Sequence, residues 1–348
     1  MLGFQEIYTQ SVISDSLSLW PSRLFASLVK VYLFESSWVI EKQAMQEIIE
    51  TENELKEKFL IIPDSADTGL IKGIYNKETG IAILNETLLP RGSLSNAERI
   101  RIDDRSEAED WHLEVLREKE KTLLQSAKTK LLLAQKYSKA IRKIHDSLIK
   151  PKPLMEFQDA FIERIFHNRS GNHERPKIDK AFFGTNAAVG PIYINQFHNP
   201  IDQCFIIKCE GSSAAAHLLK QVSEVATKKG FDTLLYHCPF FTDELDCVVI
   251  PELKTVIIES EEPHIIEPLH PNEAVLSIGD ICYDPESLFS YSLEIRELEA
   301  KYKQYMRQAV LFMQEYGRYK RQEMGHSKAN KTIQPKKLFY LLLGKDDL

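Results

Sequence analysis

The sequence predicts an α/β fold with two tandem domains, each carrying a long amphipathic helical insertion. The first observation is residues 203–264, where apolar runs and a helical pattern follow the order strand, tight turn, helix, strand, strand. The second is a weaker copy of this stretch near the start of the chain. The third is a pair of long segments whose apolar residues recur at three- and four-residue steps, which indicates helices.

The stretch 203–264 begins with an apolar run at 204–208 and continues through a turn of small residues into a helical pattern at 217–226. Further apolar runs at 233–238 and 255–259 are expected to be strands. A strand that leads through a tight turn into a helix is typical of nucleotide-binding α/β proteins, in which the turn cradles phosphate. The order of elements therefore predicts a P-loop-like unit.

The turn lacks the residues that bind a triphosphate. A phosphate loop has the pattern G-x-x-x-x-G-K-[ST], in which the lysine reaches the outer phosphates and the hydroxyl holds magnesium. Here Cys209 and Ala214 stand at the glycine positions. Ala215 replaces the lysine and Ala216 replaces the hydroxyl residue. Because alanine neither neutralises phosphate nor binds a metal, the loop is predicted to be degenerate.

Residues 1–90 resemble a degenerate copy of the P-loop-like unit at 203–264. Residues 73–85 match residues 247–259 position for position, at an offset of 259 − 85 = 174 residues. A repeat of this length indicates duplication of a whole domain. In the first copy Glu41 falls at the lysine position and Asn85 at the acidic end of the strand. This copy is therefore expected to be still less able to bind a nucleotide.

The domains are predicted at residues 1–167, with a helical insertion at about 106–166, and at residues 177–348, with a helical insertion at about 286–324. The two long helices are expected to pack on each other or to present one face to a protein partner. The apolar run at 338–343 is predicted to be a terminal strand.

The amino-acid composition narrows the possible classes of function only broadly. The chain has 348 residues, a formal net charge of −7 and 43% hydrophobic residues, which is ordinary for a globular protein. No apolar run approaches the roughly 20 residues of a membrane span, and the N-terminus does not resemble a signal peptide. The five cysteines all lie in the second half and indicate buried thiols in a reducing cytoplasm. Nucleic acid is not an expected partner.

The quoted stretches also support a resemblance to a known family. The matching residues are 182–184, 205–208, 236–238, 245–246, 249–252, 260 and 263–264. They resemble an uncharacterised family of tandem P-loop NTPase-fold proteins, largely from spore-forming Firmicutes and often labelled ATPase or nucleotide kinase. The resemblance covers nearly the whole chain and is strongest at 182–316. The family has an intact phosphate loop where this chain has residues 209–217, and usually aspartate where Glu259 and Asn85 stand.

The candidate site is the remnant of this phosphate loop. Backbone N–H groups at the start of a helix attract anions, and a carboxylate at a strand end is where such folds bind metal. The candidate nucleotide-binding residues are Lys208, Gly211, Ser212, Ser213, His217 and Glu259. The resemblance adds Tyr236, His237, Cys238, Asp243, Asp246 and His264 as family positions. The histidines and cysteines lack the paired spacing of zinc ligands, so no metal site is predicted.

The sequence favours a catalytically inactive pseudo-NTPase that works without a cofactor as a cytoplasmic scaffold or interaction protein, and the resemblance implies sporulating bacteria as its setting. The alternative is a divergent ATPase or nucleotide kinase that binds ATP and magnesium. It would use Glu259, Asp243 or Asp246, with Lys208 or Lys220 in place of the missing lysine. A third hypothesis is nucleic-acid binding through the basic segment 301–348.

Overall fold

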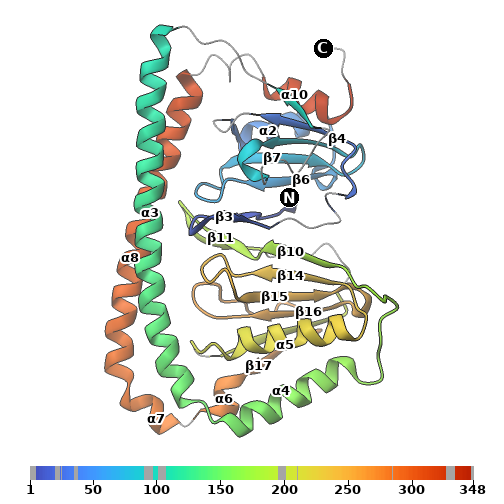
Figure 1. Cartoon of the computed structure of the whole chain (residues 1–348), viewed down its shortest axis with the longest axis vertical. Helices are drawn as coiled ribbons and strands as arrows, with labels where there is room; N and C mark the ends of the chain where they lie inside the picture. Colours follow the sequence, from blue (N-terminus) through green and yellow to red (C-terminus); the bar gives the residue numbers. More distant parts are fainter. Residues whose placement is uncertain are drawn as a thin grey trace. The chain divides into compact units, whose positions relative to one another are not determined.

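The chain forms two compact α/β units in the computed structural model (Figure 1). Unit 1 comprises Met1–Thr129, Gly184–Ile194 and Gln308–Leu348, and unit 2 comprises Lys130–Phe183 and Asn195–Arg307. The structure describes residues 5–19, 24, 26–34, 38–89, 97–100, 107–194, 201–209, 211–283, 285–326 and 334–345. The expected domains, 1–167 and 177–348, follow the sequence repeat rather than these compact units, and stay a prediction.

Unit 2 is built on a six-stranded mixed sheet. Its strands lie in the order β10 (Ile178–Phe182), β14 (Thr233–His237), β15 (Leu245–Ile250), β16 (Thr255–Glu259), β13 (Gln203–Lys208) and β17 (Glu273–Ser277). β15 is antiparallel to both of its neighbours, and the other pairs are parallel. The remaining elements are α4 (Pro151–Phe166), α5 (Ala214–Lys228), η3 (Pro251–Leu253) and α6 (Ile278–Cys282). All five residues of β16 are buried, which explains its unbroken apolar run.

Unit 1 contains a seven-stranded sheet of the same plan. Its main path is β1 (Gln5–Glu6), β6 (Phe59–Pro63), β7 (Leu70–Asn76), β8 (Ile81–Asn85), β4 (Lys30–Phe34) and β9 (Glu98–Ile100), with β5 (Ile40–Glu41) paired to β7. The central β7 is again antiparallel to both neighbours on this path. The helical elements beside it are α2 (Lys42–Thr51), η1 (Lys56–Lys58) and η2 (Glu86–Leu88).

The two sheets share one topology at a constant offset in sequence. β14 begins 233 − 59 = 174 residues after β6, and β16 begins 255 − 81 = 174 residues after β8. The order and direction of the six corresponding strands are the same in both sheets. Each first strand is followed by a two-stranded hairpin, formed by β2 (Gln10–Ser11) and β3 (Ser14–Ser18) or by β11 (Gly184–Ala187) and β12 (Gly190–Tyr193). Internal duplication of a domain would produce this correspondence.

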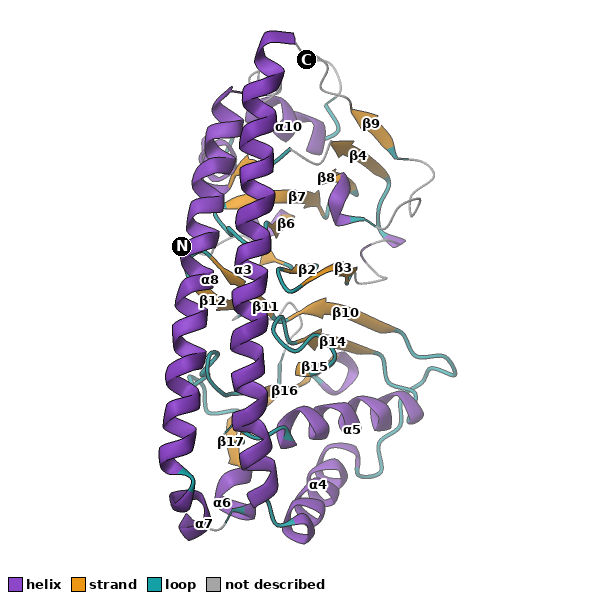
Figure 2. Cartoon of the chain, turned by 60° about the vertical axis from the view of Figure 1, so that its left-hand side comes forward, coloured by secondary structure: helices purple, strands orange, loops and turns teal. Residues whose placement is uncertain are grey.

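Two long helices contribute residues to both units. α3 (Glu107–Leu148) begins in unit 1 and ends in unit 2, whereas α8 (Ser292–His326) begins in unit 2 and ends in unit 1. The helical insertion expected at about 106–166 consists of α3 and α4, and the one expected at about 286–324 consists of α7 (Pro285–Ser290) and α8 (Figure 2). The chain offers no helix in its described parts with the length and apolar character needed to cross a membrane.

α3 and α8 contact each other in both units. In unit 2 the rings of Tyr137 and Tyr305 stack with their centroids 5.7 Å apart. In unit 1 the Arg117 guanidinium lies 2.7 Å from the Glu323 carboxylate. The predicted packing of the two helices on each other is therefore present within each unit.

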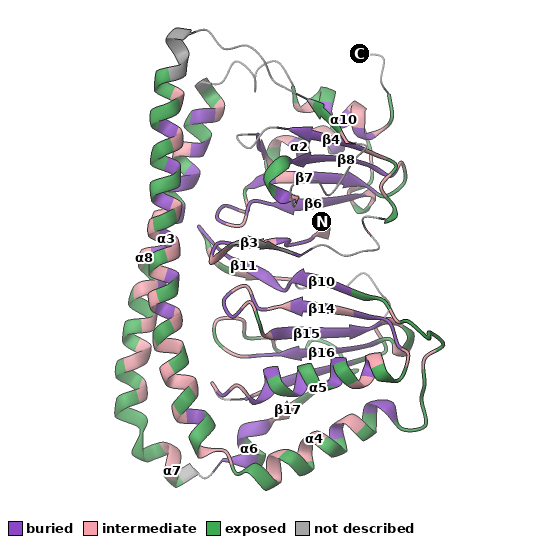
Figure 3. Ribbon diagram, viewed as in Figure 1, coloured by how far each residue is buried: buried purple, intermediate pink, exposed green. Residues whose placement is uncertain are grey.

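The predicted strand at 338–343 is wrong, because this segment forms the helix α10 (Pro335–Leu342). Its Leu338, Phe339 and Leu342 are fully buried in the core of unit 1, on which α10 packs beside α2 (Figure 3). Their spacing places them on one helical face. Proline at the first helical position fits the start of α10, since it needs no N–H there.

Candidate functional site

The loop between β13 and α5 in unit 2 has the expected compact form. Gly211 has φ +84°, a conformation that favours glycine. The Ser212 N–H donates to the carbonyl of Cys209 at 3.1 Å, and the Ser212 hydroxyl accepts the Ala214 N–H at 3.3 Å. The loop thus presents further N–H groups at the start of α5, where the helix dipole favours negative charge.

Carboxylates of the chain itself take these positions. Asp146 of α3 accepts hydrogen bonds from the Ser213 N–H at 2.8 Å and from the Ser213 hydroxyl at 2.9 Å. Glu261 accepts the Cys209 N–H at 2.8 Å. The His145 ring lies against Gly211, since a Cβ at Gly211 would be 3.3 Å from it. Asp146 and Glu261 thus accept the N–H groups of Ser213 and Cys209 from within the molecule, and α3 lies against the turn.

A largely buried arginine of α3 lies near the end of β16. Arg142 of α3 forms an ion pair with Glu244, and its guanidinium stacks over the Phe241 ring at 4.0 Å. Burial opposes the charge on Arg142, but Glu259 and Glu244 outweigh burial and raise its pKa. A permanent positive charge therefore faces the carboxylate at the end of β16.

Two carboxylates and an imidazole gather beside this arginine. Asp246 of β15 and Glu259 of β16 are each 1% exposed, and His264 is also enclosed. One ligand atom from each of the three lies within 4.8 Å of the others. Burial raises the pKa of Glu259 to about 7 although Arg142 opposes the shift, and burial together with Glu259 raises the pKa of Asp246. Burial and Arg142 lower the pKa of His264 to about 4, so its imidazole is neutral at pH 7.

The remaining candidate residues do not converge on this cluster. Lys208 forms an ion pair with Glu267 at 3.0 Å, while His217, Lys220 and Asp243 are exposed. Thus the Lys208 ammonium, at the start of the loop, is paired with Glu267, and Lys220 is exposed on α5.

The other family positions make structural contacts. The Tyr236 ring packs edge-on against Phe183 at 6.2 Å. His237 Nδ1 lies 3.0 Å from the carbonyl of Thr242, and the Cys238 sulfur accepts the Phe241 N–H at 3.2 Å. These residues shape the turn between β14 and β15.

The sequence interpretation missed the residues that α3 contributes, namely Arg142, His145 and Asp146. Their three- and four-residue spacing was a signal, because it places them on one helical face. A second signal was the repeat, since Arg142 corresponds to Tyr316 of α8 (316 − 142 = 174). Each long helix thus supplies an equivalent residue to a site in the unit where that helix ends.

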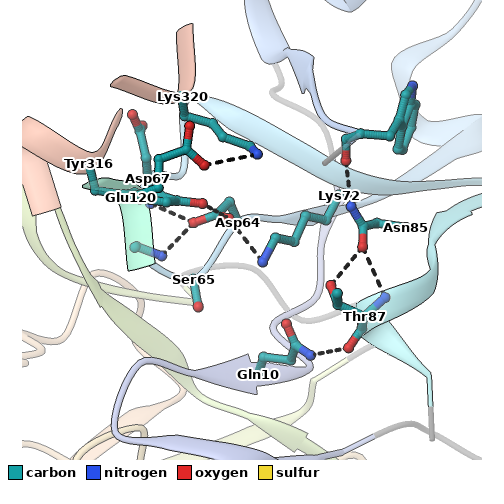
Figure 4. A network of polar contacts seen from close by, with 12 residues as sticks. Gln10, Asp64, Ser65, Asp67, Lys72, Asn85, Thr87, Glu120, Tyr316 and Lys320 are labelled. Atoms are coloured by element: carbon teal, nitrogen blue, oxygen red, sulfur yellow. Dashed lines mark hydrogen bonds and ion pairs between the residues drawn. The ribbon is translucent and has the colours of Figure 1, made fainter. Parts of the chain in front are cut away.

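The corresponding site in unit 1 is a closed polar network (Figure 4). Lys72 takes the place of Asp246 (246 − 72 = 174) and lies 3.0 Å from the buried Asp64. Asp64 also accepts the Tyr316 hydroxyl at 3.0 Å and the backbone N–H groups of residues 66 and 67. Burial opposes the charge on Asp64, but Lys72 and these hydrogen bonds lower its pKa. Asn85, at the position of Glu259, accepts the Thr87 N–H at 2.9 Å.

A second buried ion-pair group of unit 1 joins α3 to α8. The Lys320 ammonium lies 3.2 Å from Glu120 and 2.5 Å from Glu323. Burial raises the pKa of Glu120 to about 7, because the attraction of Lys320 offsets only part of the desolvation cost. Lys320 belongs to the basic segment 301–348, and so does Arg321, which pairs with Asp67 at 2.6 Å. The charges of Lys320 and Arg321 therefore form ion pairs within unit 1.

The raised pKa of Glu120 predicts a pH-dependent stability. The folded state holds this proton more tightly than the unfolded state, whose ordinary value is 4.5. The contribution is therefore present below pH 4.5 and is lost as the pH rises through about 7. We expect Glu120→Gln to remove about 1–2 kcal/mol of the decline in unfolding free energy between these values. Urea unfolding at several pH values measures it.

The matched control is Glu118→Gln, because Glu118 lies on the same helix with a side chain that is 69% exposed. Both variants retain Asp246 and Glu259, so any pH-dependent loss of unfolding free energy that these two residues cause is the same in both. It therefore cancels when the two variants are compared. Equal pH profiles for Glu120→Gln and Glu118→Gln would contradict the assignment.

Comparison with known proteins identifies no relative of this chain. No family model matches the chain, and no similar protein is found among the curated proteins or the solved structures searched. The class that the fold defines is an α/β protein with two mixed sheets of equal topology. The likeness to tandem P-loop proteins stays a prediction, and the site is interpreted from its own geometry.

Proposed function

We propose that the chain is a catalytically inactive pseudo-NTPase that serves as a cytoplasmic scaffold or interaction protein. The observation that carries the proposal is the pair of hydrogen bonds from Ser213 to Asp146, which places a carboxylate at the start of α5. A triphosphate at the same place would have to displace this carboxylate. Ala215 and Ala216 would offer it neither a positive charge nor a hydroxyl in return.

The electrostatics support the same proposal. Glu244, Asp246 and Glu259 lie around Arg142, whose side chain is 17% exposed. Burial raises the pKa of Asp246 and of Glu259, and the charge of Arg142 is already paired with Glu244. A polyphosphate brought to this cluster would therefore have to compete with Glu244 for the arginine. Hydrolysis or phosphoryl transfer would need the opposite balance of charge.

Exposed apolar side chains on the long helices support an interaction role. Trp111 and Val115 of α3 are one turn apart and are 71% and 48% exposed. Phe289 and Leu293, at the junction of α7 and α8, are also exposed. Large apolar residues that share an exposed face are common in protein-binding surfaces. We therefore propose that a protein partner binds the helices.

One observation favours the alternative of a divergent ATPase or nucleotide kinase. Arg142 places a permanent cation beside Glu259, the carboxylate at the strand end. An arginine delivered from a separate helix can stabilise phosphoryl transfer in nucleotide hydrolases. Because Asp146 already accepts hydrogen bonds from Ser213 in the loop, this enzyme is the second candidate function.

Phosphate release from ATP and GTP with magnesium tests the proposal. We expect the purified chain and its Glu259→Gln variant to give the same background rate. A rate that Glu259→Gln abolishes would instead establish the enzyme. In parallel, Trp111→Ser with Val115→Ser should weaken capture of a partner, whereas Leu311→Ser, at another exposed apolar position, should not.

A further inference from the structure

The cluster of Asp246, Glu259 and His264 in unit 2 has a property that its protein contacts do not explain. Among the described residues, neither oxygen of Asp246 accepts a hydrogen bond from a nitrogen or oxygen donor, and the same holds for Oε2 of Glu259. Thiols lie near both acids. Cys238 acts on Asp246 as a weak donor, and the Cys209 sulfur lies 3.5 Å from Oε1 of Glu259. Buried carboxylates without strong partners are costly, so such atoms point to a ligand.

The positions of unit 1 that correspond to Asp246 and Glu259 are matched by protein contacts. Lys72 stands where Asp246 stands and forms an ion pair with Asp64, and the Asn85 amide donates to the carbonyl of Trp38. Unit 1 therefore has a lysine and an amide at these two positions, whereas unit 2 has two carboxylic acids. At these two positions, unit 2 has buried carboxylate oxygens without a strong hydrogen-bond donor.

We propose that Asp246, Glu259 and His264 bind a divalent transition-metal cation. Two carboxylate oxygens and one neutral imidazole form a ligand set that suits zinc, manganese or iron better than magnesium or calcium. Donors that hold a metal at about 2.1 Å lie roughly 3.4 Å apart in a tetrahedral site. His264 Nε2 and Asp246 Oδ2 are 3.9 Å apart, and all three ligand atoms lie within 4.8 Å of one another, so binding would draw them closer together.

The surrounding charges fit a divalent cation. Arg142 lies near the cluster, and its charge is matched by its ion pair with Glu244. Burial raises the pKa of Asp246 and of Glu259, so metal binding would displace their protons. The two carboxylates would then carry two negative charges, which a divalent ion neutralises. The Phe183 ring packs edge-on against His264 at 5.8 Å and helps to hold the imidazole in place. Because Asp246 and Glu259 are each 1% exposed, the ion would be structural.

A second cluster of possible metal ligands in unit 2 differs from the first in its burial and in its hydrogen bonds. His173, Asp232 and Glu252 also bring one ligand atom each within 4.8 Å. However, Asp232 accepts the Lys177 N–H at 2.7 Å, and Glu252 accepts the Asp232 N–H at 3.1 Å. His173 and Glu252 are exposed to solvent. This cluster is hydrogen-bonded and open, and it provides the matched control.

Elemental analysis of the full-length chain, expressed with zinc and manganese in the medium and purified without chelator, tests the inference. We expect about one bound transition-metal ion per chain. After removal by chelator, zinc or manganese in large excess should raise the Tm by about 5 °C, because the ion binds only the folded state. Magnesium at the same concentration should raise it less. Asp246→Asn should lose both the bound metal and the shift, and Glu252→Gln should keep them.

Three results would overturn the inference. One is a wild-type chain that carries no metal and whose Tm neither zinc nor manganese raises. Another is a folded Asp246→Asn variant with the wild-type metal content. The third is a larger shift with magnesium than with zinc or manganese. If Asp246→Asn does not fold, His264→Gln replaces it, and the wild-type titration still decides. The inference is independent of the proposed function, since a metal here requires no nucleotide.

Discussion

Replacing Arg142 with methionine is expected to lower the free energy of unfolding of unit 2 by about 2–4 kcal/mol at neutral pH. The guanidinium is 17% exposed, lies near Glu259 and forms an ion pair with Glu244, whose side chain is 31% exposed. Methionine fills similar space but leaves these carboxylates without a compensating charge. The cost of a broken buried pair comes mainly from the charge that remains. Urea unfolding in the presence of a chelator measures the loss without interference from a bound metal.

The pH dependence separates this effect from lost packing. Arg142 lowers the pKa of Glu259 against the larger effect of burial, so removing the arginine raises this pKa further. The folded variant then holds its proton to higher pH, and the destabilisation should grow as the pH rises above about 7, where Glu259 of the unchanged chain loses its proton. The control Arg318→Met removes an exposed partner of Glu315 and should change the free energy by less than about 0.5 kcal/mol. A loss below about 1 kcal/mol for Arg142→Met at pH 8 would contradict the assigned role.

Phe339→Ala is expected to cost about 3–5 kcal/mol in unit 1, because it creates a cavity under α10. Phe339 is fully buried, and its ring centroid lies 5.9 Å from that of Phe59 in β6. The surrounding core includes Met45 and Ile49 of α2. Thermal or urea unfolding measures the change.

Phe289→Ala is the matched control for this cavity, because the Phe289 side chain is 80% exposed. It should change stability by less than about 0.5 kcal/mol. Similar small effects of both substitutions would show that α10 does not pack on the sheet in solution. In that case the C-terminal segment would not be part of unit 1.

Elements with a clear period or a full apolar run were predictable from the sequence. The long helix α3 follows from its three- and four-residue steps, and β16 has the predicted bounds because a buried strand is apolar throughout. The segment 338–343 was predicted wrongly because a short apolar run fits a buried strand or a buried helix equally well. The contacts with α2 decide this case, and they connect residues far apart in the sequence.

The site was only partly predictable, for a similar reason. The position of the loop follows from the strand and helix that flank it, and its missing lysine is visible in the sequence. Its occupation by Asp146 is not, because this residue lies 67 positions from Ser213 on another element. The pairing of Asp246 with His264 likewise depends on how β15 meets the turn after β16. Such long-range contacts leave no local pattern in one sequence.

Calorimetric titration of the chain with ATP, ADP and GTP, with and without magnesium, tests most directly whether the loop is closed to nucleotides. We predict no binding heat at millimolar ligand, because Asp146 and Glu261 occupy the donors of the loop. The titration should be repeated with metal-free and zinc-loaded chain, so that a bound ion is not mistaken for nucleotide binding. Binding at micromolar affinity that Glu259→Gln abolishes would contradict the account and make the nucleotide-binding enzyme the leading function.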